Sequence, residues 1–242
     1  MSVDPGIDLA LAFVSIGREI AEQPDLACAR ERIVGTATKI TGCDWAALAP
    51  NSSEGAARHL ASTDGELSAV LADIDRTTDD GPTRRAICSS IEVTIPDVRE
   101  DRRWPSYSEQ LLTRTPIRSV LGLRLHLHDQ SLGALMLYAA EPYFFTPALQ
   151  DSAAVYAEHA SLAYHHALEH DLVGNLQVAL ATNRDIGMAL GVLMARRMIT
   201  QEEAFSCLRV ASQQLHRKLR DLALDVILTG ELPPVPKDKV RT

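Results

Sequence analysis

The feature that most constrains the fold is a helical pattern that begins at Thr146-Pro147 and continues to Met198. A threonine can cap a helix, and a proline suits its first position. Apart from Gly174, nothing interrupts the pattern over about 50 residues, in which apolar side chains recur every three or four positions. Because a globular helix averages roughly 11 to 12 residues, the pattern predicts a long helix that links two parts of the chain. The alternative is two helices that break near Gly174.

The same segment has the spacing of a coiled coil. Its apolar residues lie at positions 168, 172, 176, 179 or 180, 186, 190 and 193, and Asn183 interrupts them. Gly187 and Gly191 lie inside the helix, and Ala195 continues their row. Each interior glycine costs a helix roughly 1 kcal/mol against alanine, so the two glycines predict that something approaches this helix closely.

The chain before Thr146 reads as an α+β domain with a central antiparallel sheet. From Leu121 to Leu127, leucines alternate with glycine, arginine and histidine, which is the period-2 pattern of a half-buried antiparallel strand. The predicted strands are 43–50, 56–63, 91–97, 118–129 and 131–141, and the predicted helices are 7–22, 25–41, 65–75, 82–90 and 106–114.

Two further helices are predicted after Met198. Thr200-Gln201-Glu202-Glu203 is a capping box that opens the first of them, and a second helix is expected around 217–228. Gly230 and the prolines after it end that helix. The expected domains are therefore 1–168, 169–230 and a disordered tail at 231–242.

Composition limits the classes of protein to consider. The four cysteines form no CxxC pair, so a zinc or disulfide framework is not expected. No apolar run approaches the roughly 20 residues of a membrane helix, and acidic residues stand where a signal peptide would be basic, so we expect a cytoplasmic protein without a membrane partner. Of the net charge of −8, residues 174–242 contribute +3 and the preceding part −11, which is typical of two modules with different partners.

Residues 176–227 resemble the ANTAR domain, a three-helix RNA-binding module of bacterial antitermination regulators. The residues in family spacing include Arg184, Ala189-x-Gly191, Leu193-Met194, Glu203-Ala204, Leu208 and Arg217-Lys218-Leu219. The resemblance implies a homodimer, paired through the long helix, that binds tandem RNA stem-loops overlapping a terminator in a transcript leader. Two positions depart from the family pattern: Leu190 stands where lysine is common, and His216 where a small amide residue is common.

The resemblance gives these residues roles in RNA binding. Ala189 and Gly191 are expected to leave room for a loop base, and five cations, Arg184, Arg196, Arg197, Arg217 and Lys218, to hold phosphates. The plainer alternative is that the small residues let helices pack closely, which we expect of Gly187 and Ala195. Exposed arginines are ordinarily a solvated face.

The first part of the chain is similar to a GAF domain, a sensory α+β module with a small-molecule pocket. The stretches that carry the similarity are 79–87, 93–107 and 117–146. The candidate ligand-binding residues are Cys43, Asp97, Trp104 and Tyr138, and the ligand itself is unknown. A structural ion pair is the plainer role for Asp97. His126 and His128 have the strand spacing of a metal pair, but no third ligand is evident, so no metal site is predicted.

The sequence contains none of the P-loop, GxSxG or HExxH patterns of common enzymes, so we expect a regulator and not an enzyme. Two alternatives stay open. One is a DNA-binding regulator that uses the last three helices as a helix-turn-helix. The other is a ligand or redox sensor whose helical tail only dimerises.

Overall fold

The structure is a computed structural model that describes residues 23, 25–51, 61–78, 80–88 and 92–234. The chain forms two compact units, Met1–Asp171 and Leu172–Thr242. The predicted helix at 7–22, most of the predicted strand at 56–63 and residues 235–242 of the predicted tail lie outside the described residues.

The first unit is built on a five-stranded sheet in the order β2-β1-β5-β4-β3, in which every pairing is antiparallel. The strands are β1 (Trp45–Pro50), β2 (Ala61–Ser62), β3 (Val93–Ile95), β4 (Ser119–Leu127) and β5 (Gln130–Ala139). His128 takes a left-handed φ of 51° in the turn between β4 and β5, so His126 and His128 do not share a strand. The predicted α+β fold with a central antiparallel sheet is confirmed.

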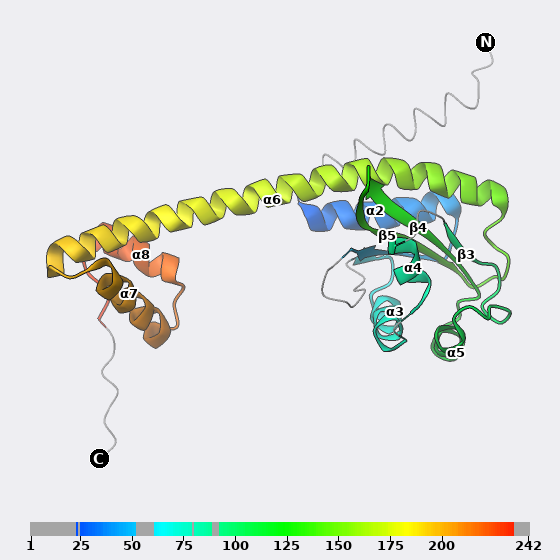
Figure 1. Ribbon diagram of the computed structural model, residues 1–242, viewed down its shortest axis with the longest axis horizontal. Coiled ribbons are helices and arrows are strands. Elements are labelled where there is room, and N and C mark those ends of the chain that lie inside the picture. The colour runs from blue at the N-terminus through cyan, green and yellow to red at the C-terminus, as the bar shows by residue number, and fades with distance from the viewer. Residues whose placement is uncertain (1–22, 24, 52–60, 79, 89–91, 235–242) are drawn as a thin grey trace, which may run out of the picture. The chain divides into compact units, whose positions relative to one another are not determined.

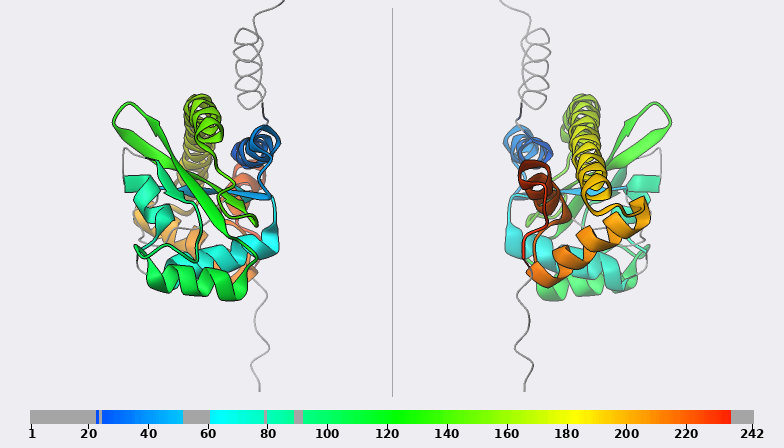
Figure 2. Two further views of the ribbon diagram at one scale, coloured as in Figure 1. Left: turned by 90° about the vertical axis from the view of Figure 1, so that its right-hand side faces the viewer. Right: turned by 90° about the vertical axis from the view of Figure 1, so that its left-hand side faces the viewer.

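One face of the sheet is covered by α2 (Leu26–Thr41) and by the first half of α6 (Figures 1 and 2). The Asp25 carboxylate accepts a hydrogen bond from the Cys28 backbone N–H at 2.8 Å and caps α2, which ends at the left-handed Gly42. The alternating leucines of β4 face these two helices. The Tyr156 hydroxyl of α6 donates a 2.8 Å hydrogen bond to the Ile33 carbonyl, which ties the two helices together.

The opposite face is covered by α3 (Gly65–Thr77), α4 (Pro82–Cys88) and α5 (Pro105–Arg114). Gly122 of β4 explains how α4 comes so close to the sheet. A Cβ at this position would lie 3.0 Å from the Ala86 Cβ and 3.1 Å from the Met136 side chain. The glycine therefore removes a side chain where helix and strand need the space.

Helix α6 runs from Pro147 to Arg197 without a break, so the predicted continuous helix of 51 residues is confirmed and the alternative break near Gly174 is wrong. Ala153 to Tyr164 supply its buried residues in the first unit. From 171 to 184 the helix has no buried residue. By length and composition it is apolar enough to cross a membrane, with 22% of its most apolar window buried inside the protein, but one helix of this kind is only weak evidence of a membrane span.

The second unit is a three-helix module made by the end of α6 with α7 (Gln201–Leu215) and α8 (Leu219–Thr229). The predicted capping box is present: the Thr200 backbone N–H donates to the Glu203 carboxylate at 2.8 Å, and the Glu203 N–H donates to the Thr200 hydroxyl at 3.3 Å. The core consists of Ala189, Leu190, Leu193, Ala204, Leu208, Ala211, Leu222, Ala223 and Val226. Leu232 packs against this core, so ordered contacts continue past the expected domain end at 230.

Candidate RNA-binding surface and sensory core

An open row of small residues lies on the exposed face of α6 in the second unit. Gly187, Gly191 and Ala195 are all exposed. A Cβ built on either glycine meets no atom within 4 Å. The expectation that a neighbouring helix of the same module packs on Gly187 is therefore wrong among the described residues.

Two predictions for this part of α6 need correction. Ala189 is 0% exposed and belongs to the module core, so its small side chain serves helix packing and does not face RNA. Leu190 is 7% exposed and lies in the same core, as does Leu193, the last position of the predicted seam. Leu168, the first position of that seam, packs against the core of the first unit. The predicted coiled-coil seam is thus free only between about residues 172 and 180.

The five predicted phosphate contacts fall into two groups. Arg196 forms an ion pair with Glu231 at 3.5 Å, and Arg217 binds Asp225 at 2.6 Å. The Asp225 carboxylate raises the pKa of Arg217, so this guanidinium is charged and already engaged within the module.

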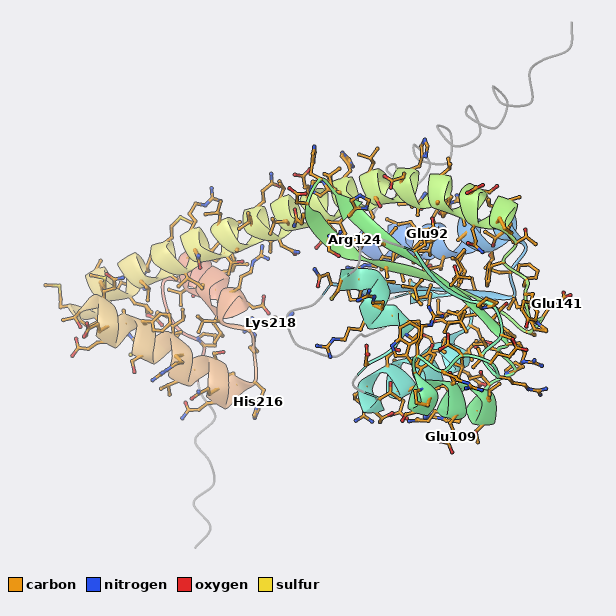
Figure 3. All side chains as sticks on the ribbon, turned by 45° about the vertical axis from the view of Figure 1, so that its right-hand side comes forward. Glu92, Glu109, Arg124, Glu141, His216 and Lys218 are labelled. Atoms are coloured by element: carbon orange, nitrogen blue, oxygen red, sulfur yellow. The ribbon has the colours of Figure 1, made fainter. Side chains whose placement is uncertain are left out.

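Arg184, Arg197 and Lys218 form the second group. All three are exposed and make no ion pair with a described residue. Lys218 lies in the turn between α7 and α8, next to the labelled His216 (Figure 3). Of the five predicted contacts, these three cations are the ones without an ion-pair partner among the described residues.

The position of His216 explains why a small amide residue is common there in the family. His216 ends α7 with a left-handed φ of 51°, a conformation that asparagine and, to a lesser extent, histidine tolerate. The turn is held by the Ser212 hydroxyl, which donates to the Arg217 carbonyl at 2.6 Å. The role of this position is therefore structural.

The four candidate ligand residues of the first unit do not form one site. Cys43 belongs to the core on the α2 side, where burial raises the pKa of its thiol, whereas Tyr138 belongs to the core on the opposite face. Asp97 accepts hydrogen bonds from Arg118 Nε at 3.1 Å and Nη2 at 2.6 Å, and this partner lowers the pKa of Asp97. The plainer role predicted for Asp97, a structural ion pair, matches this geometry. Trp104 is only 9% exposed.

A cluster of buried hydroxyl groups lies around Tyr138. The hydroxyls of Thr83, Tyr107 and Tyr138 are buried close to one another, and none makes a hydrogen bond of good geometry with a described residue. Burial raises the pKa of both tyrosines well above the usual value; the neighbouring Tyr138 raises the pKa of Tyr107 further, and the charge of Asp75 adds to both shifts. An unpaired buried hydroxyl costs about 1–3 kcal/mol. We call Thr83, Tyr107 and Tyr138 the hydroxyl cluster.

The hydroxyl cluster joins three elements: α4 provides Thr83, α5 provides Tyr107 and β5 provides Tyr138. Gly81 lies against it, since a Cβ there would be 3.2 Å from the Tyr107 ring. The sequence pointed to Tyr138 but not to the other two residues, because a lone threonine and tyrosine in helices carry no recognisable pattern. Polar atoms without partners in an apolar core are the groups that a small polar molecule can satisfy.

Comparison with known proteins agrees with this division of the chain. A GAF domain model matches residues 25–164, and an ANTAR domain model matches residues 174–227. Among curated protein sequences, none matches the chain significantly.

Solved structures confirm the fold of the first unit. The chain is similar to the GAF domain of an Acinetobacter phosphoenolpyruvate-protein phosphotransferase, with 15% identity, a TM-score of 0.54, and coverage of 69% of this chain and 97% of that one. It is also similar to the GAF domain of the cyanobacteriochrome TePixJ, with 17% identity, a TM-score of 0.51, and coverage of 61% and 94%. The chain therefore belongs to the GAF domain family and combines a GAF sensor module with a C-terminal ANTAR module, which makes it an RNA-binding regulator of transcription antitermination.

Proposed function

We propose that the protein is a cytoplasmic, signal-responsive antiterminator whose dimer binds tandem RNA hairpins, and that it is not an enzyme. The observation that carries this proposal is the open row of Gly187, Gly191 and Ala195 on the ANTAR module. Glycine is unfavourable in an exposed helix, and no neighbour among the residues that the structure describes accounts for it. An RNA loop read by shape needs such a surface, on which its backbone can approach closely.

The dimer is proposed from the free part of α6. Leu172, Val173, Leu176, Val178 and Leu180 are each between 52% and 69% exposed. An isolated helix of this length is marginal in water, so the segment needs a cover, and a second copy of the same helix supplies it. Val173, Leu176, Leu180 and Asn183 follow the alternating three- and four-residue spacing of a coiled-coil seam. An asparagine in such a seam fixes the register of a pair of helices.

A dimer suits tandem hairpins because the second hairpin binds at a high effective concentration once the first is held. A small number of unpaired cations in each module is then sufficient to hold the RNA phosphates. Each copy offers Arg184, Arg197 and Lys218, and the neutralised Arg196 and Arg217 contribute little.

The sensory step is proposed to occur at the hydroxyl cluster. A small polar molecule that hydrogen-bonds to Thr83, Tyr107 and Tyr138 would relieve the cost of their burial, and that gain in free energy would favour the bound conformation. The change needs to couple to RNA binding by only about 1–3 kcal/mol.

The test measures binding of the purified protein to a tandem-hairpin RNA, a single hairpin and a duplex DNA at one fixed salt concentration. Gly191→Leu is the test variant, because a Cβ at Gly191 meets no described atom within 4 Å and leucine favours the helix. Gly35→Leu is the matched control, since Gly35 is a helical glycine of the GAF module at which an added Cβ likewise meets no atom within 4 Å.

We expect selective binding of the tandem RNA that is lost in Gly191→Leu and kept in Gly35→Leu. Preference for the duplex DNA would favour a helix-turn-helix regulator. Equally weak binding of all three nucleic acids would leave a dimerising sensor without nucleic-acid function.

A further inference from the structure

An open pocket of about 640 Å³ lies between the end of α6 and the start of α7, in the ANTAR module. It is lined by Leu190, Thr200, Gln201, Glu202 and Phe205. Phe205 is 42% exposed, and it is the only Phe, Tyr or Trp in the chain after Tyr164. We call this hollow the Phe205 pocket.

The core of the module does not account for Phe205. Its neighbours Ala204 and Leu208 are wholly buried and belong to the core, whereas Phe205 does not. The part of the Phe205 side chain that stays in water gains nothing for folding. The exposed ring therefore points to an external partner.

The polar groups around the pocket divide by availability. Thr200 and Glu203 hold each other in the capping box, so neither is free to bind a ligand. Gln201 and Glu202 are exposed and make no hydrogen bond with a described residue. The carboxylate of Glu202 repels phosphate but accepts hydrogen bonds from amino groups. Such a rim suits the edge of a nucleobase better than the RNA backbone.

Groups that suit the backbone lie on either side. Arg209, one turn after Phe205 on α7, is exposed and forms no ion pair with a described residue. On α6, Gly187 lies one turn before Leu190 and Gly191 directly follows it. A Cβ at either glycine would meet no atom within 4 Å. A strand of RNA can therefore pass over the glycines while one of its bases turns into the pocket.

We propose that the Phe205 pocket receives one unpaired loop base that carries an exocyclic amino group. The base stacks on the Phe205 ring, Leu190 forms the floor, and Glu202 accepts a hydrogen bond from the amino group. Aromatic stacking of splayed bases is the general way in which proteins read RNA loops, and a carboxylate that accepts from a base amino group adds selectivity. This inference rests on the proposed RNA-binding function.

The experiment uses the full-length protein and tandem-hairpin RNAs selected by the wild type from a library with randomised loops. Phe205→Leu removes the ring and keeps an apolar side chain, and Phe205→Tyr keeps the ring as the matched control. Phe205→Leu should weaken binding on the order of 10- to 100-fold, and Phe205→Tyr should bind within about threefold of the wild type. Circular dichroism and sedimentation should show an unchanged fold and unchanged oligomeric state for both variants.

Loop positions are then made abasic one at a time. At one loop position, removal of the base should weaken binding to the wild type as much as the loss of the Phe205 ring does. The same removal should weaken binding to Phe205→Leu almost no further, because the two changes remove the same contact. Uracil at that position should weaken binding to the wild type but not to Glu202→Gln.

The outcomes separate the two proposals. If the wild type selects no RNA, the proposed function fails. If it selects RNA that Phe205→Leu binds equally well, or if no abasic position couples to Phe205, the base pocket is refuted while the function stands. Loss of the dimer in Phe205→Leu would also refute it, because a second copy would then occupy the pocket. Equal binding of uracil would refute the role of Glu202.

Discussion

Replacing Tyr138 by phenylalanine tests whether the hydroxyl cluster is unsatisfied in the protein without ligand. Removing a tyrosine hydroxyl ordinarily destabilises a protein, because a hydrogen bond worth about 0.5–1.5 kcal/mol is lost. Tyr138 is 0% exposed and its hydroxyl makes no hydrogen bond of good geometry with a described residue, so the sign should reverse. Tyr138→Phe should stabilise the GAF module by about 1–3 kcal/mol, which is the cost of an unpaired buried hydroxyl.

Tyr156→Phe is the matched control on the other face of the same sheet. Tyr156 is also buried, but its hydroxyl donates to the Ile33 carbonyl at 2.8 Å. This variant should therefore lose about 1 kcal/mol. Urea unfolding gives the free energies, and thermal unfolding should show Tm values that move in opposite directions by about 2–4 °C for each kcal/mol.

The reasoning is refuted if Tyr138→Phe destabilises the protein as much as Tyr156→Phe does. The hydroxyl would then already have a partner in solution, such as a buried water, and the cluster would offer nothing to a ligand. If the sign is as expected, a library of small polar metabolites can be screened by thermal shift, and a true ligand should lose its effect in Tyr138→Phe.

Three further predictions concern the dimer seam, the Asp97 ion pair and the turn at His216. Leu176→Asp with Leu180→Asp should turn the dimer into a monomer in sedimentation, whereas Leu228→Asp, at an 83% exposed position of α8, should not. Asp97→Asn should lower the free energy of unfolding by about 1.5–3 kcal/mol at pH 7. Because Arg118 lowers the pKa of Asp97, the stabilisation by this carboxylate is complete above the unfolded pKa of about 4. The difference in unfolding free energy between variant and wild type, measured in urea, should shrink as the pH falls below that value. His216→Gly should stabilise the ANTAR module in thermal unfolding by up to about 1 kcal/mol, and His216→Val should destabilise it, because only glycine adopts the left-handed φ of 51° without strain.

The sequence predicted the elements of the fold because each has a local cause. The leucine alternation of β4, Pro147 at the start of α6 and the Thr200 capping box act within a few residues, and the structure contains all three. The coiled-coil seam was predicted too long because its leucines at 190 and 193 have helical spacing whether they face a second chain or α7 and α8.

The sites were harder to predict because they depend on contacts between distant residues. Ala189 and Gly191 look alike in the sequence as small helical residues, yet the first is buried in the core and the second is open. The hydroxyl cluster brings together Thr83, Tyr107 and Tyr138 from three elements. No spacing rule relates these positions, since sheet order and helix packing bring them together.

The position of the hydroxyl cluster suggests how a signal reaches α6. Tyr138 faces the cluster, whereas Leu137, its neighbour on β5, faces the opposite core that contains Tyr156 and Ala160 of α6. A ligand that orders Tyr138 therefore acts on a strand that α6 also packs against. Between residues 171 and 184, α6 has no buried residue among those the structure describes, and a lone helix that frays there cannot carry a rotation or shift onward. The second helix of a dimer would make this segment rigid. Leu176→Asp with Leu180→Asp should consequently leave ligand binding intact while it removes the effect of the ligand on RNA affinity.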